Sequence, residues 1–295
     1  MSEAPPLRPA RLLIVTADDF GIGLETSRGI VDAARRGPVT CASALAVADA
    51  CEASLPLLDD APEIELGLHV ALTGRFRPLA ATRASGFVGR EGRFGNPGSL
   101  LLGCLARTVS RAALQDEIGA QAERLRRMAR RPLVYFDGHH HVHELPVVRE
   151  VAAELAGQGV LPANTRVTVE PPGVRRMAGG ERLRRAVIDR LGCQARPVFA
   201  AHGLRANDTL FGTLGRQAPS AGFPWAVHLA HLPDGGVVEW MVHPGRPDPA
   251  LRGVDGYVEG RVVEWRALTA PQHRAMWERL PWPRGGKSRL RDLAA

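Results

Sequence analysis

The sequence has few of the residues that mark several common classes of protein. Lys287 is the only lysine among 295 residues, aromatic residues make up 5%, and the four cysteines lie far apart. So few aromatic rings leave little with which to stack single-stranded nucleic acid. The cysteines have no C-x-x-C spacing, so they indicate neither a disulfide framework nor a thiolate zinc site and favour a reducing compartment. No apolar run could span a bilayer, so we expect a cytoplasmic protein without stable membrane insertion.

The remaining composition is that of an ordinary globular protein. Hydrophobic residues make up 45% and charged residues 23%, and 295 residues suit one large α/β domain. The net charge of +7 comes from arginines on predicted helices, which we interpret as solvated helix faces, with an anionic substrate or surface as the alternative. We expect a single domain over residues 1–295, with an irregular insertion at about 74–109 and a short basic tail at about 281–295.

Predicted strands and helices alternate along most of the chain. Strands are predicted at residues 12–17, 39–48, 64–72, 133–136, 166–171, 196–203, 237–245 and 262–265. Helices are predicted at residues 24–36, 49–58, 110–130, 146–156 and 181–191, and from residue 269. This order predicts βαβ units around a mostly parallel sheet. Apolar residues occupy the even positions of 64–72, so His69 should point away from the apolar face.

Polar side chains gather where four of these strands end. Asp18 and Asp19 follow the first strand, His69 lies late in 64–72, the run His139–His143 follows 133–136, and His243 follows the strand residues 238–242. The carboxyl ends of parallel strands lie on one rim, which is where active sites of α/β proteins are assembled. We therefore expect these side chains to meet.

One aspartate and two histidines make a suitable site for a divalent metal ion with room for water. A second aspartate beside such a water can act as general base, and a further histidine can protonate a leaving group, which together describe metal-assisted hydrolysis of an amide or ester. Each feature has a simpler interpretation: Asp18-Asp19 as a turn, His69 as a structural residue and His243-Pro-Gly as a bend. The cluster DGHHHVH has few such structural uses.

Six segments in their order resemble the YdjC-like carbohydrate deacetylase family, also written ChbG/HpnK. They are TADDFG (16–21), RRGPVT (35–40), LGLHVALT (66–73), DGHHHVH (137–143), RVTVEP (166–171) and VHPG (242–245). The resemblance implies an α/β fold of the distorted (β/α) barrel type, with mostly parallel strands and the active site at their carboxyl ends. It also implies removal of an N-acetyl group from an amino sugar, in an oligosaccharide, glycolipid or related glycoside, with release of acetate.

Transferred residue by residue, the resemblance assigns one divalent ion, Mg²⁺ or Zn²⁺, to Asp19, His69 and His139. Asp18 becomes the base and His243 the acid. We also expect contacts to the acetylated amino-sugar substrate from four residues: Phe20, His141, His143 and Arg166.

Two other functions stay open at this point. Aspartate and histidine clusters with abundant arginine also suit a metal-dependent phosphoesterase, which commonly uses two metals. The basic surplus suits a non-enzymatic protein that binds nucleic acid or an anionic surface. Nucleic acid is not the partner we expect, and a homodimer remains one option for assembly.

Overall fold

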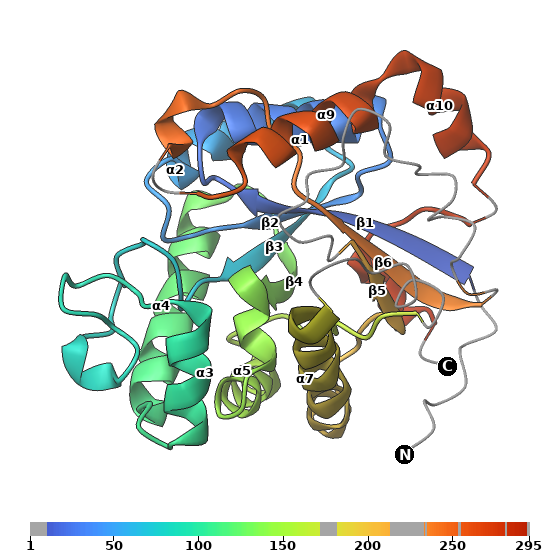
Figure 1. The fold of residues 1–295 in the computed structure, drawn as a ribbon. Helices are drawn as coiled ribbons and strands as arrows, with labels where there is room; N and C mark the ends of the chain where they lie inside the picture. The colour runs from blue at the N-terminus through green and yellow to red at the C-terminus, as the bar shows by residue number, and fades with distance from the viewer. Residues whose placement is uncertain are drawn as a thin grey trace.

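The computed structural model describes residues 11–171, 182–212, 233, 235–252, 255–280 and 282–293, and its centre is one parallel sheet of six strands (Figure 1). The strand order is β4-β3-β2-β1-β6-β5, and every neighbouring pair is parallel. The strands are β1 Arg11–Phe20, β2 Cys41–Ala44, β3 Glu65–Val70, β4 Leu133–Gly138, β5 Thr209–Phe211 and β6 Gly236–Val242. The predicted parallel α/β architecture is confirmed.

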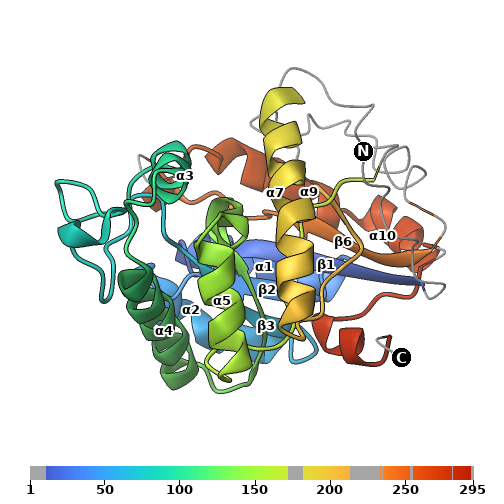
Figure 2. The ribbon, with the colours of Figure 1, turned by 90° about the horizontal axis from the view of Figure 1, so that it is seen from below.

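Helices cover the sheet from two sides. They are α1 Leu24–Arg36, α2 Cys51–Ser54, α3 Pro97–Leu105, α4 Arg111–Met128, α5 Val148–Gly157, α7 Arg182–Ala201, α9 Val258–Thr269 and α10 Pro271–Glu278. Figure 1 shows α1 and α9 on one side and α4, α5 and α7 on the other, and Figure 2 shows the second group side by side. In the part of the chain that the structure describes, no helix is long and apolar enough to cross a membrane.

The segment 164–170 bridges the two edge strands of the sheet. The Phe136 N–H of β4 donates to Asn164 O, and the Leu210 N–H of β5 donates to Val169 O. The side chain of Asn207 replaces a neighbouring strand here, since its amide bonds both the N–H and the C=O of Val167. The predicted strand 166–171 is therefore extended but makes no regular ladder, and this irregular closure distorts the barrel.

Alternation along β1 separates an outer from an inner face. Leu13, Val15 and Ala17 join the large apolar cluster that contains the helices, whereas Leu12 and Ile14 join a second cluster. This second cluster fills the amino-terminal part of the barrel interior and contains Leu12, Ile14, Cys41, Tyr135, Val237 and Leu290. Because side chains alternate along a strand, the next inward positions of β1 are polar and lead toward the carboxyl end.

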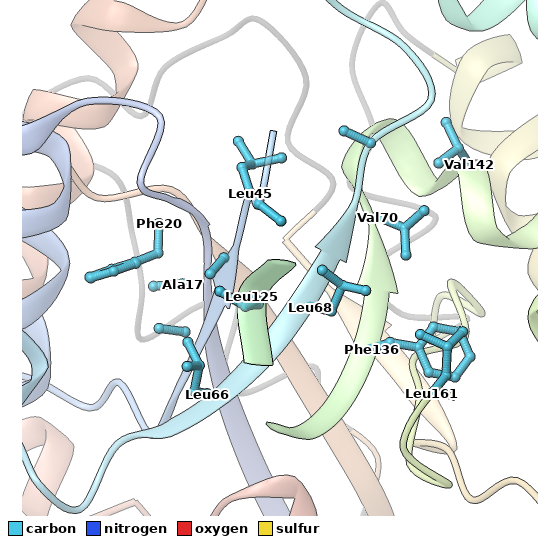
Figure 3. Close-up of a cluster of buried hydrophobic side chains, with 14 of the residues drawn as sticks. Ala17, Phe20, Leu45, Leu66, Leu68, Val70, Leu125, Phe136, Val142 and Leu161 are labelled. Atoms are coloured by element: carbon cyan, nitrogen blue, oxygen red, sulfur yellow. The ribbon is translucent and has the colours of Figure 1, made fainter. Parts of the chain in front are cut away.

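The same alternation orients β3 as the sequence predicts. Leu66, Leu68 and Val70 lie in the outer apolar cluster, where Figure 3 shows Leu68 and Val70 near Phe136 of β4. His69, between Leu68 and Val70, therefore faces the interior. Its direction is set by the two-residue period of the strand.

Two predicted strands are helices in the structure. Residues 196–203 fall largely within α7, which contains Pro197 and buries Gly192, Ala195 and Phe199 on one face. Residues 262–265 lie in α9, whose buried positions also follow a helical period. Both predictions are wrong because a short apolar run does not by itself distinguish a strand from a buried helix turn.

The insertion at 74–109 is more ordered than expected. It contains α3, whose first turn is capped by the Asn96 side chain accepting from Ser99 N–H. Its stem is held by Glu117 of α4, whose carboxylate accepts from three successive backbone N–H groups, at Leu79, Ala80 and Ala81. Such a carboxylate satisfies donors that otherwise lack a protein partner.

We expect Glu117→Ala to lower the free energy of unfolding by about 2 kcal/mol and the melting temperature by about 5 °C, because it leaves these N–H groups unpaired. Thermal unfolding followed by circular dichroism measures the change. Glu123→Ala, an exposed residue on the same helix, is the control and should change little. Equal melting temperatures of the two variants would contradict the anchoring role.

Candidate metal centre at the carboxyl ends of the strands

The two acids at the end of β1 both point into the barrel. Neighbouring side chains of a regular strand point to opposite faces. Asp19 instead has a φ of 66°, in the left-handed region that aspartate tolerates, and the β1–β2 register shifts between Ala17 and Phe20. This break brings both carboxylates toward His69, whose Nε2 lies 3.3 Å from Asp19 Oδ1 and 4.0 Å from Asp18 Oδ2.

Asp19, His69 and His139 form a group that could hold a metal ion. Asp19 Oδ1 lies 2.8 Å from His139 Nδ1 and 3.3 Å from His69 Nε2. Ligands bound about 2.1 Å from one ion lie about 3 Å apart, so these spacings fit a shared cation. An oxygen and two imidazole nitrogens are also a donor set that divalent metals accept.

The far nitrogen of His69 has a partner suited to a metal ligand. His69 Nδ1 lies 2.6 Å from Asp137 Oδ1, so Nδ1–H donates to this carboxylate and leaves Nε2 directed at Asp19. Metal-binding histidines commonly make such a contact. Burial alone would lower the pKa of His69, but Asp18 and Asp137 raise it to about 10, so the carboxylates around this ring favour a cation.

Arg261 of α9 holds the other oxygen of Asp19. Arg261 Nη2 lies 2.5 Å from Asp19 Oδ2, and Arg261 Nε lies 2.6 Å from Asp255 Oδ2. Burial alone would raise the pKa of Asp19, but His139 and Arg261 hold it well below its ordinary value. Asp19 is therefore an anion that keeps Oδ1 directed toward the two histidines.

Arg166 binds the Asp18 carboxylate through two hydrogen bonds. Arg166 Nη1 and Nη2 each lie 2.7 Å from one oxygen of Asp18, and Arg166 Nη2 also lies 3.0 Å from Asp137 Oδ2. Arg166 Nε donates to Glu239 Oε1 at 2.8 Å. This planar fork fixes the direction of the Asp18 carboxylate beside the candidate metal ligands.

His243 reaches the same rim from β6. Ala17 of β1 pairs with Val242 of β6, so the next residues, Asp18 and His243, lie side by side at the ends of neighbouring strands. The His243 ring is half-buried and meets the Tyr257 ring edge-on at a centroid distance of 5.7 Å. Glu264 of α9 fixes this corner, because its carboxylate accepts from both His243 N–H and Tyr257 O–H.

The histidine run turns sharply after His139. His140 and His141 have φ values of 55° and 59°, and His140 Nδ1 lies 2.9 Å from Thr73 Oγ1. His141 is half-buried, and its expected contact with substrate stays a prediction. His143 is fully buried, stacks on Phe199 and donates Nε2–H to Arg166 O.

Burial argues against three of the four expected substrate contacts. Phe20 has no exposed surface and lies among the hydrophobic side chains of the outer cluster (Figure 3). Arg166 and His143 are also fully buried; Arg166 binds Asp18 and Glu239, and His143 Nε2 donates to Arg166 O. We therefore correct these expectations: Phe20 is a core residue, His143 supports the segment 164–170, and Arg166 orients Asp18.

Sequence reasoning missed several supporting residues. Asp137 was part of the quoted cluster DGHHHVH, and its position before the histidines was a usable signal. Glu239 is the single charged residue in the otherwise apolar strand β6, and a lone acid in a buried strand was a usable signal. Arg261 and Glu264 gave no signal, because Glu264 lies in the segment 262–265 that was predicted to be a strand and Arg261 directly precedes it.

Comparison with known proteins shows which proteins the chain resembles. A model of the YdjC-like protein family matches residues 12–279. The chain is 34% identical to a carbohydrate deacetylase from Homo sapiens, over 91% of this chain and 87% of that protein. It is 31% identical to a carbohydrate deacetylase from Geobacillus stearothermophilus, over 88% of this chain and 90% of that protein.

A solved structure from Enterococcus faecalis V583, described as a candidate cellobiose-phosphate cleavage protein, shares the fold. It superposes with a TM-score of 0.73 at 22% identity and covers 97% of this chain and 100% of that chain. This similarity concerns the fold, and the family match over most of the sequence shows that the chain belongs to the YdjC-like protein family.

Proposed function

We propose that the protein is a metal-dependent carbohydrate deacetylase that removes an N-acetyl group from an amino sugar and releases acetate. The observation that carries the proposal is the group Asp19, His69 and His139, placed beside an aspartate whose direction Arg166 fixes. The names of the human and Geobacillus relatives support a carbohydrate substrate. The proposed substrate class is an oligosaccharide, glycolipid or related glycoside.

We infer that Asp19 Oδ1, His69 Nε2 and His139 Nδ1 hold one divalent ion. When bound, such an ion lowers the pKa of a coordinated water and polarises a carbonyl oxygen. Two imidazoles favour zinc over magnesium, and Mg²⁺ or Zn²⁺ is the proposed cofactor. Asp137 and Arg261 bind the outward atoms of two of these ligands and so set their directions.

In this proposal Asp18 and His243 move the protons. A carboxylate oxygen of Asp18 accepts the proton of the attacking water, and Arg166 keeps the carboxylate in place during the transfer. The water oxygen bonds to the acetyl carbon as the carbon–nitrogen bond breaks. The imidazole of His243 donates a proton to the departing nitrogen, so that acetate and a free amine are formed.

We expect the protein to release acetate from at least one member of a panel of N-acetylated saccharides, and chelator treatment to lower the rate at least about 100-fold. Acetate measured by a coupled assay gives the rate, and adding back Zn²⁺, Co²⁺ or Mg²⁺ should restore it. The absence of release from every saccharide, with every metal, would contradict the proposal.

The two alternative functions predict different results. A phosphoesterase would hydrolyse phosphate esters, but in the described residues the second candidate metal group shares His69 with the first, and Arg166 already binds two of its carboxylates. A binding protein would retain DNA in a salt-sensitive manner without hydrolysis. The same protein preparation can be tested for hydrolysis of phosphate esters and for binding of DNA.

A further inference from the structure

The last described residues of the chain enter the barrel from the end opposite the candidate metal centre. Leu13 N–H at the start of β1 donates to Pro283 O, and Gly285 N–H donates to Leu13 O. Leu290 is fully buried in the inner apolar cluster. This segment corresponds to the short basic tail that the sequence predicts, and it lies beyond residue 279, where the match to the family model ends.

The segment carries the only lysine of the chain into the interior. The Lys287 side chain has no exposed surface. Its Nζ lies 3.0 Å from Glu239 Oε1, 3.8 Å from Asp137 Oδ2 and 4.3 Å from the centre of the Tyr135 ring. An ammonium ion at full burial is costly unless it balances nearby negative charge, so these carboxylates explain its place.

Each carboxylate beside Lys287 also contacts the candidate active site. Glu239 Oε1 accepts from Arg166 Nε, and Nη1 and Nη2 of Arg166 donate to the two oxygens of Asp18. Asp137 Oδ2 forms an ion pair with Arg166 Nη2 at 3.0 Å, and Asp137 Oδ1 accepts from His69. Asp137 thus connects Lys287 to the proposed metal ligand His69. Glu239 and Arg166 connect Lys287 to the proposed base Asp18.

Lys287 supplies part of the positive charge that balances the carboxylates of this buried network. It contains three carboxylates, of Asp18, Asp137 and Glu239, and two cations, of Arg166 and Lys287. Without Lys287, Glu239 and Asp137 would depend more strongly on Arg166, the cation that also binds Asp18. Glu239 and Asp137 would then compete more strongly with Asp18 for its guanidinium, because unpaired charge is poorly screened in the interior.

We propose that Lys287 is a positioning residue, which sets the directions of Asp18 and His69 by balancing the charge of Glu239 and Asp137. The proposal rests on the deacetylase function proposed above. Lys287 itself lies on the side of the network away from the metal ligands. Its removal should therefore change turnover and metal affinity but leave substrate affinity unchanged.

The test compares Lys287→Met, Lys287→Arg and Leu290→Ala. Leu290→Ala is the matched control, because it weakens the packing of the same segment and keeps the lysine. For each variant we would measure kcat and KM for acetate release, the Zn²⁺ dissociation constant by competition with a coloured chelator, and the melting temperature.

We expect Lys287→Met to lower kcat by about 10-fold to 100-fold and to weaken Zn²⁺ binding by about 10-fold, with KM within about twofold of wild type. Lys287→Arg should recover part of kcat, because it restores the positive charge. Leu290→Ala should lower the melting temperature but keep kcat and Zn²⁺ affinity within about twofold. Unchanged kcat and Zn²⁺ affinity in Lys287→Met, or an equal loss in Leu290→Ala, would overturn the proposal.

A double variant covers the case in which Lys287→Met does not fold. Lys287→Met with Glu239→Gln removes one charge of each sign, so the net charge of the network stays at its original value, and the glutamine oxygen can still accept from Arg166. We expect it to fold and to recover kcat to within about tenfold of wild type. Failure to fold, or folding without this recovery, would overturn the proposal. A wild-type protein that releases no acetate would instead contradict the deacetylase function, and Zn²⁺ affinity would still decide the role of Lys287.

Discussion

Asp19→Asn should lose its divalent metal and at least about 1,000-fold of its acetate-releasing activity. A bound metal contributes several kcal/mol of transition-state stabilisation, and about 4 kcal/mol corresponds to this factor. Asparagine is the informative substitution, because it tolerates the left-handed backbone at Asp19 and has nearly the same shape. The loss would then come from the missing charge toward His69 and His139 and not from a changed strand end.

Metal content by mass spectrometry and acetate release by a coupled assay measure both effects. Asp255→Asn is the matched control, since Asp255 is the other carboxylate that binds Arg261 and does not belong to the metal-ligand group. This control should keep its metal. An Asp19→Asn protein that binds metal as tightly as wild type would remove Asp19 from the proposed ligand set.

We expect Asp18→Asn to lower kcat by about 100-fold or more while the metal stays bound, because the variant loses the group that accepts the proton but keeps the proposed ligands. Arg166 retains two buried carboxylate partners, Asp137 and Glu239, so the variant should fold. Steady-state kinetics and the Zn²⁺ dissociation constant separate chemistry from metal binding, and the latter should stay within about threefold of wild type.

Asp32→Asn is the control for the loss of a carboxylate that an arginine binds through two hydrogen bonds. Asp32 binds Arg246 through two hydrogen bonds of 2.7 Å and 2.9 Å, a geometry similar to that of Asp18 with Arg166, but does not belong to the metal-ligand group. Its kcat should be close to that of wild type. Wild-type turnover by Asp18→Asn would show that another group accepts the proton.

The strands that carry the candidate site were predictable because their signal is local. The apolar run in β1 and the two-residue alternation in β3 depend only on neighbouring residues, and both elements formed where they were expected. The short strand β5 was not predicted. In α9 the buried face includes Arg261 and Glu264, so the apolar stripe that normally identifies an amphipathic helix is interrupted.

The burial of Phe20 and Arg166 was unpredictable for a related reason. Both residues stand beside conspicuous motifs, and nothing in their own segments shows on which side of the backbone they lie. The register shift after Ala17 and the passage of 164–170 between β4 and β5 decide their directions. Arg166 then meets Asp18, which lies 148 positions away in the sequence.

The kind of chemistry that the strand ends present follows from the amino-acid sequence. Acids and histidines follow four predicted strands, and a parallel sheet necessarily brings its carboxyl ends to one rim. How these groups are held depends on the tertiary fold, because Arg261 reaches Asp19 across 242 positions and Lys287 reaches Glu239 from the far end of the barrel. Buried charges must find partners wherever the fold brings opposite charge close, and that proximity has no counterpart in local sequence.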